Sequence, residues 1–173
     1  TLTYTFEATQ GTVAATMNGT AVTSGGEIAY DKPAVLKITA KSGYVLGKLT
    51  VDNQVVNLPE GTFDATTKVT TYAAYTTANL KTAMSINVEF TAKKTVSVSA
   101  SPLSATRDEI AADKNLPTVT FTPSISGQKY QFKNASGTLM DKLPATDGVY
   151  TIVATSPETA DYAALTDESN KFT

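Results

Sequence analysis

The residues whose side chains could take part in catalysis or ligand binding are the acid pairs, the serines that precede glycines, and the tyrosines. The pairs Asp108-Glu109 and Asp167-Glu168 could offer oxygen ligands to Ca²⁺, which needs about six to eight of them. Neither pair has the Asp-x-Asp-x-Asp-Gly spacing of a calcium loop, and adjacent acids in a polar loop are more often solvated. We therefore expect no metal site at these positions.

A serine nucleophile would need a base beside it. The chain has no His, the commonest general base, and no Cys. Ser42-Gly43 and Ser126-Gly127 stand where turns are expected, and turns favour both residue types. Gly25-Gly26 is not followed by the Lys-Ser/Thr helix start of a phosphate-binding loop. We expect a protein that is not an enzyme and that needs no cofactor.

Tyr72 and Tyr75 are the candidate ligand-binding residues. A tyrosine offers a flat apolar face with a polar edge, which suits stacking on a sugar or filling a groove of a partner. Tyr72 could instead close a core, with Tyr44 starting a strand and packing inward. Exposure of Tyr72 and Tyr75 on one surface would favour binding, and burial would favour the structural role.

Composition favours a folded β protein and excludes several classes. Thr, Val, Ile and Tyr are plentiful, and they prefer strands. The 14 basic residues are scattered and outnumbered by 16 acidic ones, so we expect no nucleic-acid partner. No run approaches the ~20 apolar residues that span a bilayer, and no secretion signal opens the chain. The chain begins inside a strand pattern, so we expect a piece of a longer protein.

The first half is organised around the stretch 34–56. Apolar and polar residues alternate from Leu36 to Ala40 and again from Lys48 to Asp52, which predicts two strands with one buried face each. Ser42-Gly43 supplies the turn between these two runs. Asp52-Asn53 starts the next reversal, because both residue types tolerate turn dihedrals.

Other signals in this half predict further elements. Leu2 to Phe6 alternates as a first strand, and Asn18-Gly19 between two short β runs predicts a hairpin. The segment 73–84 has a weak helical period through Leu80 and Met84, which predicts a short helix in this Thr-rich stretch.

The order of these motifs along the chain resembles that of a known family of repeat modules. NGTAVTSG (18–25), VLKITAKSGYVLGKLTVDNQVV (35–56) and INVEF (86–90) resemble the divergent internalin-type B-repeat modules of bacterial surface proteins, over about residues 2–92. The resemblance implies a β-grasp-like domain on a secreted or surface-anchored protein. The segment 58–85 is longer than the usual link of that family.

The apolar pattern breaks at Ala92-Lys93-Lys94, which predicts a domain boundary. Beyond it, Val119 with Phe121 and Tyr130 with Phe132 alternate as strands, and Ile125 to Gly127 forms a turn between them. The polar segment 105–115 predicts a long loop or one helical turn.

The organising element of the second half is LPATDGVYTIVA (143–154). Tyr150, Ile152 and Ala154 are predicted to face one side of a strand, with Val149 and Val153 on the other. Gly148 two residues before Tyr150, after Leu143-Pro144, resembles the tyrosine corner of Greek-key sandwiches. The run 148–173 resembles the last strands of bacterial Ig-like modules, although Ile152 stands where antibody-type domains have Cys. The resemblance covers about residues 95–173.

These observations predict a mainly β fold with two tandem small antiparallel β domains. Residues 1–93 would form a B-repeat-like, β-grasp-like domain with one short helix, and residues 94–173 an Ig-like β-sandwich. The expected function is a non-catalytic spacer or adhesion-type module of a larger secreted or cell-surface bacterial protein. The alternative is a carbohydrate-binding module that uses exposed tyrosines. The protein is expected to be an extracellular monomer whose partner is a protein or glycan on a host or neighbouring surface.

Overall fold

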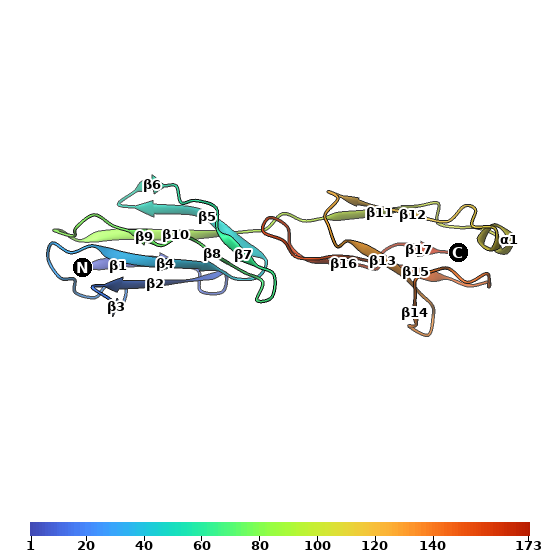
Figure 1. Ribbon diagram of the computed structural model, residues 1–173, viewed down its shortest axis with the longest axis horizontal. Helices are drawn as coiled ribbons and strands as arrows, with labels where there is room; N and C mark the ends of the chain where they lie inside the picture. The colour runs from blue at the N-terminus through green and yellow to red at the C-terminus, as the bar shows by residue number, and fades with distance from the viewer. The chain divides into compact units, whose positions relative to one another are not determined.

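The computed structural model describes residues 1–173 and contains 17 strands and one five-residue helix, so the prediction of a mainly β fold is confirmed. The chain forms two compact units (Figure 1). The first comprises Thr1–Lys93 with Thr159–Ala163, and the second Lys94–Glu158 with Ala164–Thr173.

The first unit contains ten strands in two sheets. One sheet has the order β1-β10-β5-β6, and the other has the order β3-β2-β4-β8-β7, with β9 also paired to β4. The strands are β1 (Leu2–Phe6), β2 (Gly11–Met17), β3 (Thr20–Val22), β4 (Ala34–Ala40), β5 (Tyr44–Val51), β6 (Gln54–Val56), β7 (Thr62–Asp64), β8 (Val69–Thr71), β9 (Tyr75–Thr76) and β10 (Met84–Ala92).

The core of this unit lies between the two sheets. The inward residues of β4, from Ala34 through Leu36 and Ile38 to Ala40, are completely buried, as the alternation predicted. They form one cluster with Leu49 and Val51 of β5. Burial of apolar side chains on the inner face of each sheet is what stabilises the unit.

The strands β4 and β5 do not pair with each other, because they belong to different sheets. The turn at Ser42-Gly43 therefore carries the chain from one sheet to the other. Two tight hairpins are confirmed: Asn18-Gly19 joins β2 to β3 and Asp52-Asn53 joins β5 to β6. All four turn residues have positive φ, as two-residue hairpin turns of the primed type require.

The first and last strands of this unit are parallel neighbours, an exception to the predicted antiparallel arrangement. Leu2 lies opposite Met84 and Phe6 lies opposite Val88. The chain therefore enters the unit at one end of β10 and leaves at the other end (Figure 1).

The free edge of β1 is covered by the segment Thr23–Gly26. The Ser24 hydroxyl accepts a hydrogen bond from Tyr4 N (2.8 Å) and donates one to Tyr4 O (2.7 Å). Gly25 N donates to Leu2 O at 2.8 Å. These contacts occupy backbone groups that would otherwise offer a template for another strand.

The predicted helix at 73–84 is wrong. The segment contains the short strand β9, and Leu80 forms an isolated bridge with Lys32. Leu80 is 2% exposed and its N–H donates to Lys32 O. Threonine side chains lose conformational freedom in a helix, which disfavours a helix in this Thr-rich segment. The backbone is instead extended and buries Leu80 in the core. The spacing of Leu80 and Met84 therefore does not indicate a helix.

The second unit contains seven strands and one helix, also in two sheets. A two-stranded sheet pairs β11 with β12, and the other sheet has the order β14-β13-β15-β16, with β17 also paired to β15. The elements are β11 (Ser97–Ser101), α1 (Arg107–Ala111), β12 (Thr118–Thr122), β13 (Lys129–Lys133), β14 (Leu139–Met140), β15 (Tyr150–Ser156), β16 (Leu165–Asp167) and β17 (Lys171–Phe172).

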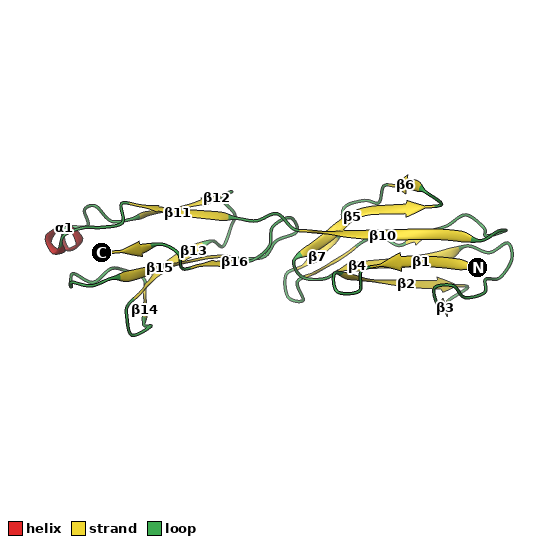
Figure 2. Ribbon diagram, turned by 180° about the vertical axis from the view of Figure 1, so that it is seen from behind, coloured by secondary structure: helices red, strands yellow, loops and turns green.

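The segment 105–115, left open between loop and helical turn, contains the helical turn α1 at one end of this unit (Figure 2). Thr106 and Glu109 form a capping box: the Thr106 hydroxyl accepts from Glu109 N, and Glu109 Oε2 accepts from Thr106 N at 2.7 Å. The hydrogen bonds that the Glu109 carboxylate accepts from Thr106 N and Thr106 Oγ1 lower the pKa of this carboxyl from its usual value. Ile110 is the buried residue of α1 and joins the core.

Tyr150, Ile152 and Ala154 of β15 are buried, as predicted. Val153 is buried too, at 9% exposed, so only Val149 of the opposite face is open to solvent. The Tyr150 hydroxyl donates to Thr146 O at 3.2 Å and contacts Thr146 Oγ1 at 2.7 Å. This is the hydroxyl-to-backbone contact that the resemblance to a tyrosine corner implies.

Replacing Tyr150 with Phe should lower the free energy of unfolding by about 1–3 kcal/mol, because the Thr146 groups lose a partner. The matched control is Tyr130→Phe, whose half-exposed ring contacts Phe132 and whose hydroxyl forms no hydrogen bond. Its effect should stay within about 0.5 kcal/mol. Equal denaturation midpoints for both variants would contradict the structural role of the Tyr150 hydroxyl.

Each unit has its own hydrophobic cluster, so fragments 1–93 and 94–173 should fold when expressed separately. We expect each fragment to unfold in a single cooperative transition, with agreement between circular dichroism and fluorescence. A fragment that lacks such a transition would place the folding boundary elsewhere.

Candidate functional site

The strongest candidate site is a hollow in the first unit, with a cavity volume of about 380 Å³. One wall is formed by β5 from Val45 to Leu49, and another by the segment Val55–Gly61, which passes from β6 toward β7. Thr70 of β8 and Tyr72, which follows β8, complete this part of the lining. The hollow therefore lies where the chain crosses between the two sheets.

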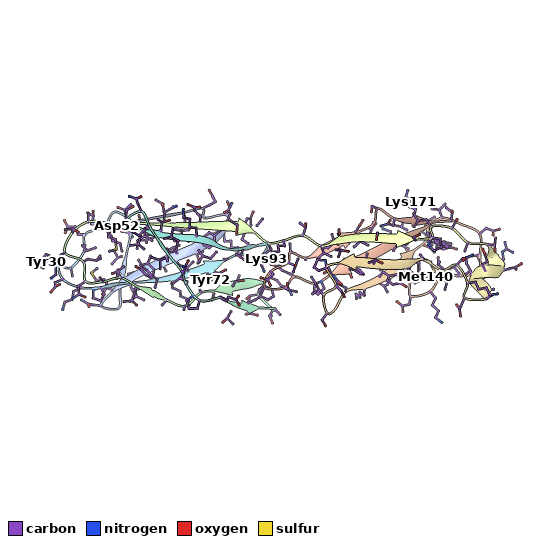
Figure 3. All side chains as sticks on the ribbon, turned by 90° about the horizontal axis from the view of Figure 1, so that it is seen from above. Tyr30, Asp52, Tyr72, Lys93, Met140 and Lys171 are labelled. Atoms are coloured by element: carbon purple, nitrogen blue, oxygen red, sulfur yellow. The ribbon has the colours of Figure 1, made fainter.

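Tyr72 connects two segments of the backbone at this hollow. Its side chain is only 9% exposed, and its Oη accepts a hydrogen bond from Leu46 N at 2.7 Å (Figure 3). Leu46 precedes Gly47, the extra residue of β5 at the register shift opposite Glu89 and Phe90. Burial raises the pKa of the Tyr72 hydroxyl from its usual value, and the hydrogen bond from Leu46 N opposes this shift.

Thr70 also lines the hollow and was not singled out in the sequence. It is 3% exposed, and its Oγ1 has no hydrogen-bond partner. A buried hydroxyl without a partner is uncommon, since its desolvation is not compensated. The alternation of Thr70 and Tyr72, two residues apart, is the signal that could have placed both side chains on one face.

Gly61 keeps the backbone close to these two residues. A Cβ atom at this position would lie 2.5 Å from Thr70 Cγ2 and 2.8 Å from Tyr72 Cε1. Any larger residue would therefore press into the hollow. With two hydroxyls among its lining residues, the hollow could hydrogen-bond a neutral polar group, such as a water molecule or the hydroxyl of a ligand.

Tyr75 does not lie in this hollow. It belongs to β9, opposite Leu36, and its half-buried ring packs against the core cluster. Tyr72 and Tyr75 therefore do not form one exposed surface, and the arrangement agrees with the structural role left open in the sequence. Tyr44, at the start of β5, packs against the same cluster. Tyr30 is the most exposed tyrosine, at 72%, and lies at the end of this unit (Figure 3).

Three of the four side chains in the acid pairs have hydrogen-bond or ion-pair partners. Glu109 is held in the capping box of α1, Asp167 Oδ1 accepts from Ser169 N at 2.7 Å, and Glu168 forms an ion pair with Lys133. No group of three or more Asp or Glu side chains is arranged to hold a metal ion.

Comparison of the chain with protein-family models, with curated proteins and with solved structures gave no match. No helix has both the length and the apolar character needed to cross a bilayer.

The Thr70 hydroxyl can be tested against a matched buried threonine. Thr70→Val should raise the free energy of unfolding by about 1 kcal/mol, because it removes an unpaired polar group without changing the shape. Thr77 is 4% exposed, and its hydroxyl accepts from Ala34 N and donates to Ala78 O. Thr77→Val should therefore lower stability by about 1–3 kcal/mol. A loss of stability in Thr70→Val would mean that a water or ligand pairs with its hydroxyl.

Proposed function

We propose that this chain is a non-catalytic spacer or adhesion-type module of a larger secreted or cell-surface bacterial protein, and that it resists a pull along the chain. The observation that carries the proposal lies in the first unit: its first strand, β1, runs parallel to its last strand, β10, and is hydrogen-bonded to it. This pairing determines how a pull on the two ends of that unit would load it.

In the first unit, β1 and β10 pair in parallel over five residues. Thr1 precedes one end of this pair, and the chain leaves β10 beyond the other end, at Ala92. A pull on the two ends would slide β1 along β10. Hydrogen bonds between strands lie across the strand direction, so such sliding loads all of them together.

In the second unit a single residue, Thr173, makes a contact of this kind with the segment that follows β11. Thr173 N donates to Leu103 O at 3.0 Å, and Ala105 N donates to Thr173 O at 3.1 Å. In a parallel pair, one residue hydrogen-bonds to the two residues that flank its partner on the neighbouring segment, as Thr173 does with Leu103 and Ala105. The segment after β11 and the last residue are therefore linked side by side, as β1 and β10 are.

The bacterial and cell-surface part of the proposal comes from the sequence resemblance to B-repeat and Ig-like modules. The Tyr150–Thr146 contact supports the second of these resemblances.

Single-molecule pulling tests whether the pairing of β1 with β10 resists force along the chain. The chain has no Cys, so two introduced cysteines define the attachment points. With Thr1→Cys and Lys94→Cys, force slides β1 along β10. With Thr1→Cys and Lys81→Cys, both handles lie near the Met84 end, where Met84 N donates to Thr1 O, and force peels β1 away one bond at a time.

We expect a several-fold higher unfolding force for the 1/94 pair than for the 1/81 pair. The two variants have the same fold, so a difference reports the direction of loading alone. Equal forces would remove the mechanical basis of the spacer proposal.

The carbohydrate-binding alternative retains one supporting observation, the hydroxyls of Thr70 and Tyr72 among the residues that line the hollow, of which the Thr70 hydroxyl has no partner. A glycan array should give no saturable signal if the chain is a spacer. A signal that is lost in Thr70→Val, and kept in the folded control Tyr130→Phe, would assign the chain to the binding module instead.

A further inference from the structure

The strand β12 has one partner only. It pairs antiparallel with β11, and the two form a sheet of their own. No backbone hydrogen bond joins β12 to any other segment. The edge of β1, by contrast, is covered by Ser24 and Gly25. The second side of β12 is therefore an open strand edge, and such an edge can accept another strand.

The backbone groups on this open side belong to Val119 and Phe121. Ser97 Oγ donates to Thr122 O, so this carbonyl points toward β11. The N–H and C=O of successive residues in an antiparallel strand alternate between its two sides. The groups of Thr118, Thr120 and Thr122 thus point to β11, and those of Val119 and Phe121 point to the open side.

The side chains of β12 do nothing to block this edge. Thr118, Thr120 and Thr122 are exposed, and Val119 and Phe121 are half-buried. The strand contains no charge and no proline, the residue types that usually protect an edge.

Apolar surface continues beyond the start of β12. A cavity of about 260 Å³ is lined by Ile110, Leu116, Pro117, Tyr130, Phe132 and Leu143, with acidic and basic residues also present. Leu116 is 36% exposed and Tyr130 39% exposed. An added strand would cover part of this surface as well as the backbone edge.

We propose that a second copy of this chain pairs with β12, in antiparallel orientation about Thr120. The sequence TVTFT is complementary to itself in this register. Thr118 lies opposite Thr122 of the second copy, Val119 opposite Phe121, and Thr120 opposite Thr120. Cross-strand pairs of threonines, and of an aromatic with a β-branched residue, are both favourable.

The register also agrees with the direction of the backbone groups. A two-fold axis at Thr120 brings Val119 opposite Phe121, and these two residues carry the outward-pointing groups. Each Val119–Phe121 pair then exchanges two hydrogen bonds, and Thr120 forms the closer, non-hydrogen-bonded pair. Sheets β11-β12 of two copies become one four-stranded sheet with closed two-fold symmetry. The protein is then a dimer, and not the monomer expected from its sequence.

Cysteine cross-linking of the full chain tests this register. Thr120→Cys would place two thiols on Cα atoms about 4.5 Å apart across the two-fold axis, within the range of a disulfide. The matched control is Ser99→Cys, an exposed position opposite Thr120 on β11. In the dimer its two copies lie three strand spacings apart, about 14 Å, which is too far to cross-link. Mild oxidation should give covalent dimer from Thr120→Cys and not from Ser99→Cys.

A charge test separates pairing from misfolding. Thr120→Lys and Thr120→Glu should each be monomeric in sedimentation, because like charges would face each other at the axis. An equimolar mixture should recover the dimer. Wild-type protein should show a weight-average mass that rises with concentration, and Ser99→Lys should behave as wild type.

Three results would overturn the proposal: wild-type protein that stays monomeric over about a hundredfold concentration range, equal cross-linking of the two cysteine variants, or a mixture that stays monomeric although both charge variants fold. Dimers cross-linked through Ser99→Cys would instead place the interface on β11. If the wild-type protein stays monomeric at every concentration, the open edge of β12 would instead be a site for a strand from another protein.

Discussion

The parallel pairing of β1 with β10 is the constraint on which the first unit depends. Because β10 is also paired with β5, it is a central strand, and β1 closes the sheet beside it. The same pairing fixes the entry and exit of the chain at opposite ends of the unit. It also makes β1 an edge strand, and an edge needs protection. Ser24 provides it with a single hydroxyl that satisfies both backbone groups of Tyr4.

The edge strands of the two units differ in length and in how well they are covered. In the first, the outermost strands are short or covered, as β3, β6 and β7 have three residues each. In the second, the sheet β11-β12 has five-residue strands and no cover on the outer side of β12. Its core cluster is also smaller, with five buried residues. Pairing between copies would bury backbone and apolar surface where this unit has least of its own.

Tyrosine hydroxyls are tied to the backbone in both units. Tyr4 Oη donates to Val22 O at 2.9 Å, Tyr72 Oη accepts from Leu46 N, and Tyr150 Oη donates to Thr146 O. Each ring packs against its core while the hydroxyl satisfies a polar backbone group nearby. These aromatic side chains therefore connect segments that do not pair in a sheet. The same contacts engage the hydroxyls of these three tyrosines, whereas Tyr30 and Tyr130 remain exposed.

Much of the fold follows from the sequence because local rules decide it. Alternation placed the inner faces of β1, β4 and β15, and Asn18-Gly19 and Asp52-Asn53 specified their hairpins through residues that accept positive φ. The sequence also marked Tyr72 and Tyr150, but not what their hydroxyls bind. Sheet membership is not local. The separation of β4 from β5, the parallel pairing of β1 with β10, the extended backbone around Leu80 and the unpaired Thr70 hydroxyl depend on contacts between residues far apart in the chain. Alternation says which face of a strand is buried, but only the packed core decides which strand becomes its neighbour, because any strand edge offers the same backbone groups.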